Sequence, residues 1–459
     1  MLKGMSRRSL LQFAGAGAWL GSRMATARQA ETSGALRQHI DADWFRKALI
    51  EEIDHWRKSA ELPSGFVQQT IDRQWRPAAS QTATLTCQGR HIFMRARGYE
   101  VTRDPVYLES LRRIADFTLA NFRDTQYGGM FFSVTPDGKV VDDRKDGYGT
   151  AFAIFGLSHA ARVTRDEKYR TAALETWAQT KKGLRDKAGF FKFATTRDYS
   201  QAPGPTRGGT NKRGDAAAFV PPQESSGTNT QNPMMHLFEA LLACYDATGS
   251  REVFADAEAH GNAMFTRLFQ DTGGYLPEFY DAEWKPLAES TQGHVELGHQ
   301  FEWAYLWGQA VDRGFPGRDL RLYGERLLHF GTKAAYDTET GGILSVGDYE
   351  GHPVQAPKGL WQQCEFLRAL MNYAAVRNHK ELWAAFDKSL EMFKEHFMDA
   401  KYGGCFSTYY DPRTPPEESR LGKNGIDCYH VCGMYSEALR LTGVLGRCTA
   451  PQFRDRRKK

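Results

Sequence analysis

Two histidines of the chain each stand three residues before a glutamate, a spacing that could place an acid and a base side by side. His236 precedes Glu239 in "NPMMHLFEA", and His299 precedes Glu302 in "GHQFEW". Side chains three or four residues apart lie on one face of a helix, so the members of each pair would point the same way. Because neutral imidazole titrates near physiological pH and can accept or release a proton, such histidines suit proton transfer at a carbon atom.

Five further polar or aromatic residues occupy comparable positions, beside loops and close to the start of predicted helices. They are Arg90, Asn232, Trp361, Glu365 and His430. Each one taken alone has an ordinary structural explanation, since a single histidine or tryptophan on an apolar helix is usually part of the core. Their shared placement favours one common pocket, into which helices of an inner ring would point these side chains.

Several kinds of chemistry find little support in this set of residues. The histidines lack the clustering typical of zinc centres, and paired carboxylates for calcium are missing. Nucleophilic hydrolysis lacks a G-x-S-x-G elbow. No G-x-G-x-x-G loop follows a strand, so together with the missing ligand clusters no metal and no cofactor is expected. Glu302 and Glu365 could still be the opposed carboxylates of a hydrolase or lyase, and that alternative stays open.

A phrase that combines glycine with aromatic or β-branched residues recurs six times, about 60 to 85 residues apart. The copies begin at Ser64, Tyr127, Ala188, Gly273, Gly341 and Tyr402. Between them lie segments whose apolar residues recur every three or four positions, as amphipathic helices require. Two helices for each of six phrases predict an all-α fold, an (α/α)6 barrel of six helical hairpins with short β-hairpins in the loops at one end. An extended solenoid is the alternative, but the irregular repeat length favours a closed ring.

One connection between predicted helices is much longer than the others. Residues 195–232 are rich in Gly, Pro, Ser, Thr and Asn and show no helical period. Loops of this length in a compact domain either cover a functional site or are disordered, and the sequence does not decide between the two.

Composition indicates a single large globular domain over residues 35–448, followed by a basic tail at 449–459. The 459 residues are 41% hydrophobic and 12% aromatic, enough for a sizeable core. Part of the formal charge of +5 sits in the two ends, so no basic stripe supports binding of nucleic acid or an anionic membrane. The seven cysteines include no C-x-x-C pair, which argues against a disulfide framework, although Cys428 and Cys432 are close in sequence.

Residues 1–27 resemble a twin-arginine export signal. Paired arginines in "SRRSLLQ" precede the apolar stretch "FAGAGAWLG" and the small-residue site "ATA" that ends at Ala27. The apolar stretch is too short to span a bilayer. We therefore expect cleavage near Ala27 and a soluble periplasmic or secreted protein that is not inserted in a membrane.

Seven motifs together make the chain similar to the N-acylglucosamine 2-epimerase superfamily, which includes cellobiose 2-epimerases, mannose isomerases and sulfoquinovose isomerase. The motifs are "QGRHIF", "YGTAFAIFGL", "NPMMHLFEA", "GHQFEW", "LWQQCE", "YGGCF" and "YH", in the family's order between about Arg90 and Leu441. The resemblance implies an (α/α)6 barrel. It also implies a sugar isomerase or 2-epimerase that acts on a reducing aldose or ketose through a cis-enediolate, without metal or nicotinamide.

The same resemblance implies roles for four residues in catalysis. His299 and His430 would be the acid and base that move protons at C1 and C2 of the sugar. His236 would help to open the sugar ring, and Glu302 would orient or hydrogen-bond near His299.

The resemblance also implies a substrate-binding set, which consists of Arg90, Tyr148, Asn232, Trp361 and Glu365. Arg90 would bind an oxygen at the reacting end and Trp361 would stack on the sugar. Leu360, where the family often has a second tryptophan, and Arg95, where a small or apolar residue is usual, depart from the pattern and leave the exact substrate open. A sugar is the only partner expected, with the protein a monomer or homodimer, and a non-catalytic sugar-binding protein is a further alternative.

Overall fold

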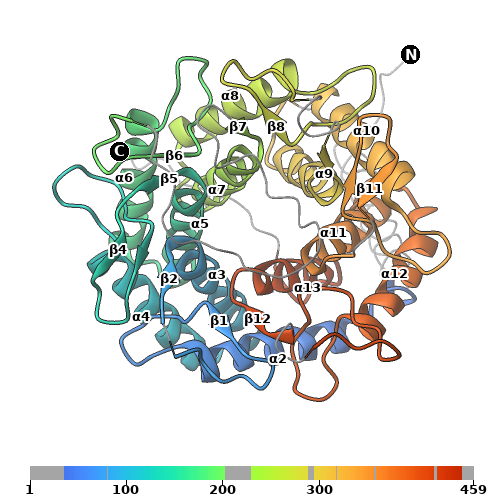
Figure 1. Ribbon diagram of the computed structural model, residues 1–459, viewed down its shortest axis with the longest axis horizontal. Helices are drawn as coiled ribbons and strands as arrows, with labels where there is room; N and C mark the ends of the chain where they lie inside the picture. Colours follow the sequence, from blue (N-terminus) through green and yellow to red (C-terminus); the bar gives the residue numbers. More distant parts are fainter. Residues whose placement is uncertain are drawn as a thin grey trace, which may run out of the picture.

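Two concentric rings of helices form the body of the molecule in the computed structural model (Figure 1). The structure describes residues 36–79, 81–201, 229–287, 294–316, 318–355, 358–417 and 421–446. The inner ring consists of α3 (Leu85–Thr102), α5 (Gly147–Thr164), α7 (Asn232–Thr248), α9 (Leu297–Asp312), α11 (Leu360–Val376) and α13 (Cys428–Leu441). The outer ring consists of α2 (Ala42–Ala60), α4 (Pro105–Asn121), α6 (Glu167–Gly183), α8 (Arg251–Arg267), α10 (Arg318–Ala335) and α12 (Leu382–His396). The predicted (α/α)6 barrel is confirmed.

Short turns join each inner helix to the next outer helix, and long loops lead back to the next inner helix. This alternation determines which ends of the inner helices lie together. A turn of two residues joins α3 to α4, because α3 ends at Thr102 and Asp104 caps α4 by accepting from the Val106 amide. The chain returns from each outer helix to the next inner helix through a long loop. All six inner helices therefore begin at the same end of the barrel, which we call the loop end.

The six glycine-aromatic phrases lie in these long loops, each closed by an antiparallel bridge. The bridges are Glu61↔Val67, Arg123↔Met130, Arg185↔Phe191, Gln270↔Tyr275, Tyr336↔Ile343 and Met398↔Cys405. Glycines in the phrases have positive φ, for example Gly65 at 92° and Gly403 at 75°, which explains why glycine recurs there. The six copies found in the sequence thus correspond to six equivalent turns.

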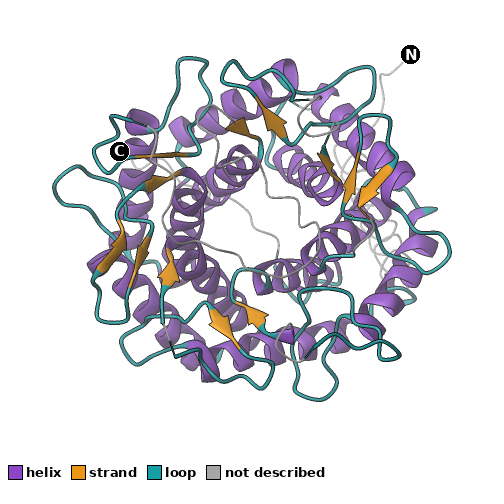
Figure 2. Ribbon diagram, in the orientation of Figure 1, coloured by secondary structure: helices purple, strands orange, loops and turns teal. Residues whose placement is uncertain are grey.

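Short strands link neighbouring loops around the loop end (Figure 2). The strands are β1 (Thr70–Ile71), β2 (Ala83–Thr84), β3 (Ser133–Val134), β4 (Val140–Asp142), β5 (Lys145–Asp146), β6 (Ala194–Thr195), β7 (Asn229–Thr230), β8 (Phe279–Tyr280), β9 (Val295–Glu296), β10 (Val346–Gly347), β11 (Pro353–Gln355) and β12 (Lys423–Asn424). Only β3–β4 and β10–β11 pair within one loop, whereas β2–β3, β5–β6, β7–β8 and β9–β10 pair between successive loops. The pairing of β1 with β12 joins the first loop to the last and closes the ring.

The inner helices are buried around most of their circumference, as their position between the outer ring and the centre requires. In α5, Gly149 to Ala161 are all buried. Its Gly156 packs against Gly89 of α3 so closely that an added Cβ would lie 2.6 Å from the Gly89 carbonyl oxygen. Small residues at this crossing let the two backbones approach each other.

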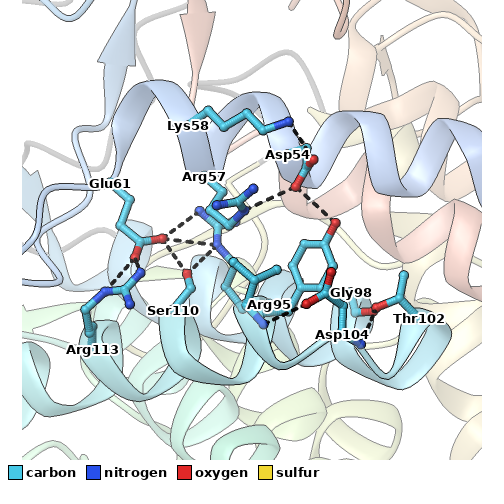
Figure 3. Close-up of polar contacts among 12 residues, drawn as sticks. Asp54, Arg57, Lys58, Glu61, Arg95, Gly98, Thr102, Asp104, Ser110 and Arg113 are labelled. Atoms are coloured by element: carbon cyan, nitrogen blue, oxygen red, sulfur yellow. Dashed lines mark hydrogen bonds and ion pairs between the residues drawn. The ribbon is translucent and has the colours of Figure 1, made fainter.

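Arg95, the unusual arginine of the "QGRHIF" region, belongs to a structural cluster away from the predicted site residues (Figure 3). Its guanidinium donates to the Ser110 hydroxyl at 3.0 Å and lies 3.4 Å from Glu61, which also pairs with Arg113 at 2.6 Å. Glu61 follows α2, so this carboxylate ties α2 to α3 and α4. The departure from the family pattern at Arg95 is therefore compensated within the helix packing.

Several predicted features lie outside the described residues: the export signal at 1–27, the basic tail at 449–459, and residues 202–228 of the long loop. Within the described residues, none of the helices is both long and apolar enough to span a membrane. The six cysteines described there, including Cys428 and Cys432 on α13, are free and buried.

Candidate active site

The predicted site residues occupy the first two turns of the inner helices, at the loop end. They are Arg90 on α3, Tyr148 on α5, Asn232 and His236 on α7, His299 and Glu302 on α9, Trp361 and Glu365 on α11, and His430 on α13. All six inner helices contribute, and contacts between the side chains link neighbouring helices. The structure thus brings together residues that are up to 340 positions apart in sequence, Arg90 and His430 being the outermost.

Each of the three histidines is paired through Nδ1 with a buried glutamate. The distances are 3.2 Å for His236 and Glu239, 2.7 Å for His299 and Glu278, and 2.8 Å for His430 and Glu365. A carboxylate accepts from Nδ1–H and thereby orients the ring. Nε2 is then the ring nitrogen of each histidine that is left for a substrate.

The pKa values of His299 and His430 move in opposite directions. Burial alone would lower the pKa of His299, but the charge of Glu278 and its hydrogen bond raise this pKa above its usual value. Burial, followed by the charges of Arg90 and His236, lowers the pKa of His430 far below its usual value. The opposite shifts favour the charged form of His299 and the neutral form of His430, an arrangement that can serve as an acid and a base.

The carboxylate partner of His299 is Glu278, so the predicted pairing of His299 with Glu302 is wrong. Glu302 turns toward His236, whose Nδ1 lies 3.9 Å from Oε1. Neither oxygen of Glu302 has a hydrogen-bond partner among the described residues. Burial and the charges of Glu365 and Glu239 raise the pKa of Glu302 far above its usual value, which favours the protonated form of this carboxyl.

Glu278 was missed by the sequence analysis because it lies in a loop phrase without helical period. It directly precedes β8, and the pairing of Thr230 with Phe279 brings it beside α7 and α9. The Thr230 hydroxyl and the Gln231 amide donate to its carboxylate at 2.9 and 2.7 Å. Only knowledge of this strand pairing could have placed Glu278 at His299.

Arg90 presents a fixed positive charge to the site. Its guanidinium donates to the Tyr148 hydroxyl and to the Ile426 carbonyl, both at 2.6 Å, and lies 4.1 Å from the Phe152 ring centroid. Among the described residues it forms no ion pair with a carboxylate. An arginine held in this way can stabilise negative charge that develops on a substrate oxygen.

Trp361 lies between the two central histidines. Its ring centroid is 4.8 Å from that of His299 and 5.5 Å from that of His430. Asn232, at the start of α7, has a buried amide oxygen without a partner among the described residues. An aromatic face flanked by hydrogen-bonding groups is an arrangement that suits a sugar ring.

Two groups of side chains within the described residues have donor atoms close enough to hold a metal ion. One is His236, Glu239 and Glu302, and the other is Glu302, Glu365 and His430, with the donor atoms of each group within 4.8 Å of one another. Both groups share Glu302, which would have to lose its proton to bind a cation. The positive charges of Arg368 and Arg90 already act on this carboxyl.

A cavity of about 750 Å³ opens at the opposite end of the barrel from the long loops. It is lined by the C-terminal halves of the inner helices and reaches Glu239 and Arg368. These two residues contact His236 and Glu365, respectively, so the cavity reaches the side chains directly beside the layer of histidines.

Comparison with known proteins agrees with the barrel. The model of the N-acylglucosamine 2-epimerase family matches residues 65–212 and 210–434. The chain is 27% identical to a mannose-6-phosphate isomerase of Rhizobium meliloti over 72% of its own length and 81% of the relative's. It is 20% identical to a cellobiose 2-epimerase of Dictyoglomus turgidum, over 85% and 98% of the two chains. A crystal structure of a D-mannose isomerase superposes with a TM-score of 0.75 at 19% identity, over 87% and 98% of the chains.

The family match and the curated relatives identify a class of enzyme that isomerises or epimerises carbohydrates. Within this class, the chain belongs to the N-acylglucosamine 2-epimerase family.

Proposed function

We propose that this protein converts a reducing aldose or ketose through a cis-enediolate, as an aldose–ketose isomerase or a 2-epimerase. Neutral His430 would accept the proton from C2 while charged His299 gives a proton to the carbonyl oxygen at C1. For the isomer, protonated His430 would give its proton to C1 while His299 takes the proton of the C2 hydroxyl. For the epimer, His299 would take the proton back from the C1 oxygen and deliver it to the opposite face of C2, and His430 would lose the proton it took to solvent. The opposite pKa shifts of His299 and His430, on either side of Trp361, are the observation that carries this proposal.

Other residues would support these proton transfers. Arg90 would stabilise the negative charge on the enediolate oxygens, and Trp361 would pack against the sugar. His236, with Glu239 behind it, would assist ring opening, and protonated Glu302 would donate a hydrogen bond to a sugar oxygen. Tyr148, Asn232 and Glu365 complete the proposed binding and positioning set.

Proton NMR of reducing sugars in D2O with the purified protein tests this function. D-mannose, mannose 6-phosphate and cellobiose are suitable first substrates, because relatives carry these names. The expected result is loss of the C2 proton signal together with the appearance of an isomer or epimer. Cleavage of an oligosaccharide without exchange would instead assign Glu302 and Glu365 as hydrolase or lyase residues, and sugar binding without exchange would indicate a non-catalytic protein.

We further propose that the protein acts outside the cytoplasm as a monomer or homodimer, with the catalytic domain at 35–448. The twin arginines at Arg7 and Arg8 support export in the folded state. Fractionation of cells that carry Arg7→Lys and Arg8→Lys together should find the protein in the cytoplasm and not in the periplasm. An unchanged distribution would refute export by this route.

A further inference from the structure

A closed chain of hydrogen bonds begins and ends on α9, around His299. Trp303 lies one turn after His299, and its indole Nε1 donates to Gln231 Oε1 at 2.6 Å. Gln231 Nε2 donates to Glu278 Oε2 at 2.7 Å, and the same oxygen lies 2.7 Å from His299 Nδ1. All four residues are at most 5% exposed, so water cannot substitute readily for any of these bonds.

The direction of this chain is determined by its first member, since an indole N–H can only donate. Gln231 must therefore turn Oε1 toward Trp303 and Nε2 toward Glu278. The 2.9 Å separation between Gln231 Nε2 and His299 Nδ1 is that of two donors that share one acceptor, Glu278 Oε2. The Thr230 hydroxyl occupies the other carboxylate oxygen, which leaves His299 Nδ1 as a donor to Glu278.

The elements explain why these residues meet. Gln231 directly precedes α7 and makes no side-chain cap to that helix, so its amide is free to reach across to α9. The β7–β8 pairing places Glu278 opposite Gln231. The chain thus connects α7, α9 and the loop that carries β8, three separate parts of the barrel.

We propose that Trp303, Gln231 and Glu278 are positioning residues that keep a proton on Nδ1 of His299, so that Nε2 faces the substrate and the ring takes the Nδ1–H tautomer whenever it is neutral. None of the three is expected to touch the sugar. The consequence for turnover rests on the proposed role of His299, whereas the tautomer itself is a property of the resting protein. A neutral histidine with its proton on Nε2 has no lone pair there, so it cannot take a proton from the substrate and return to the charged form that gives one back.

The test uses Glu278→Gln as a background, because an amide at 278 could present either its oxygen or its nitrogen to His299. With Trp303 in place, Gln231 Nε2 still needs a hydrogen-bond acceptor. The side-chain oxygen introduced at position 278 should therefore face Gln231 and His299, and neutral His299 should keep its proton on Nδ1. Adding Trp303→Phe removes the donor that sets the direction, and a mixture of tautomers should appear. The readout is the pair of imidazole ¹⁵N shifts of His299 in the full-length protein, assigned by their loss in His299→Gln.

Trp307→Phe in the same background is the matched control. Trp307 lies one turn further along α9, is equally buried, and its indole nitrogen has no partner among the described residues. E278Q/W307F should keep the tautomer and the kcat of E278Q, while E278Q/W303F should lose a further factor of about 10 in kcat. An unmixed Nδ1–H signal in E278Q/W303F, or equal mixing in both double variants, would overturn the proposal. If the wild type converts no sugar, the function proposed above is wrong. The ¹⁵N shifts still test the positioning of His299, because they do not require turnover.

Discussion

At the scale of single residues, His299 and His430 acquire different charges because their glutamates have different surroundings. Burial opposes ionisation of Glu278, but the charge and the hydrogen bond of His299, helped by the hydrogen bond from Gln231, lower its pKa below the usual value. Burial instead raises the pKa of Glu365, even though Arg368 lies beside it. The charge of Glu278 outweighs the burial of His299, whereas the charge of Glu239 does not outweigh the burial of His430, so the two pKa values shift in opposite directions.

Replacing Glu278 by Gln should shift the alkaline limit of activity to lower pH. Glu278 raises the pKa of His299, and the charged form required for catalysis is lost as the pH rises through that pKa. Without the carboxylate the pKa falls, so this loss begins at lower pH. The measurement is the pH profile of kcat/KM.

The control for this profile is Glu283→Gln, which removes a carboxylate from an exposed position in the same loop. It should leave the profile unchanged. An alkaline limit in Glu278→Gln that stays where the wild type has it would contradict the assignment of His299 as the charged acid.

Chelation of divalent cations should leave the activity unchanged. Protonated Glu302, shared by both groups of potential ligands, and the nearby Arg90 and Arg368 make the site unfavourable for a cation. Elemental analysis and the rate of C2 proton exchange after dialysis against EDTA provide the measurements. Stoichiometric zinc or manganese whose removal abolishes exchange, with recovery on addition, would show that Glu302 is a metal ligand.

Helical spacing and motifs in the sequence were enough to predict part of the candidate site. His236, His299 and His430 stand at the starts of periodic apolar segments, so their common position followed from the fold. Glu278 and Gln231 could not be recognised from the sequence. The pairing of β7 with β8 brings them to His299, and the indole of Trp303 orients Gln231 there. The predicted neighbour of Glu302 was wrong. Its position on α9 lets the carboxyl face either His299 or His236, and residue spacing alone does not decide between them.

At the scale of elements, the crossing of α3 and α5 depends on paired glycines. A Cβ on Gly156 would lie 2.6 to 3.1 Å from backbone atoms of Gly89, which cannot move independently of its helix. Gly156→Ala should therefore lower the free energy of unfolding by about 1–3 kcal/mol, despite the better helix propensity of alanine. Denaturation with urea measures this change.

Gly308→Ala on α9 is the matched control for this substitution. A Cβ there meets only side-chain atoms, the nearest being a guanidinium nitrogen of Arg377 at 3.1 Å, at the end of a flexible side chain. It should be neutral or stabilise the protein by up to about 1 kcal/mol. Equal effects of the two substitutions would show that backbone contact at the α3–α5 crossing does not limit stability.

Helices could be predicted from the sequence with more success than strands. Apolar residues at three- and four-residue intervals identify α4, α7 and α11 directly, and Asp-Pro at 104–105 marks the start of α4. The strands are two or three residues long, which is too short to show the alternation of apolar and polar residues that predicts a strand. Their pairing between loops of successive hairpins is set by the closed ring, which no local pattern encodes.

At the scale of the whole molecule, closure of the ring is what assembles the site. The β1–β12 pairing joins residues 70–71 to 423–424, and α13 packs against both α2 and α3. Arg90 near the start of the ring therefore donates to the Ile426 carbonyl near its end. An open solenoid would separate Arg90 from His430, so the geometry proposed for catalysis exists only in the closed barrel.

The most direct test of the account is the rate at which deuterium from D2O replaces the C2 proton of a sugar that the wild type converts. His430→Gln and His299→Gln should each slow this exchange by at least about 100-fold, because each removes one partner of the proton transfer. His159→Gln serves as the control, since His159 is as buried as these two histidines but lines the cavity at the opposite end. Its rate should equal that of the wild type. Wild-type exchange in a folded His430→Gln protein would contradict the central claim.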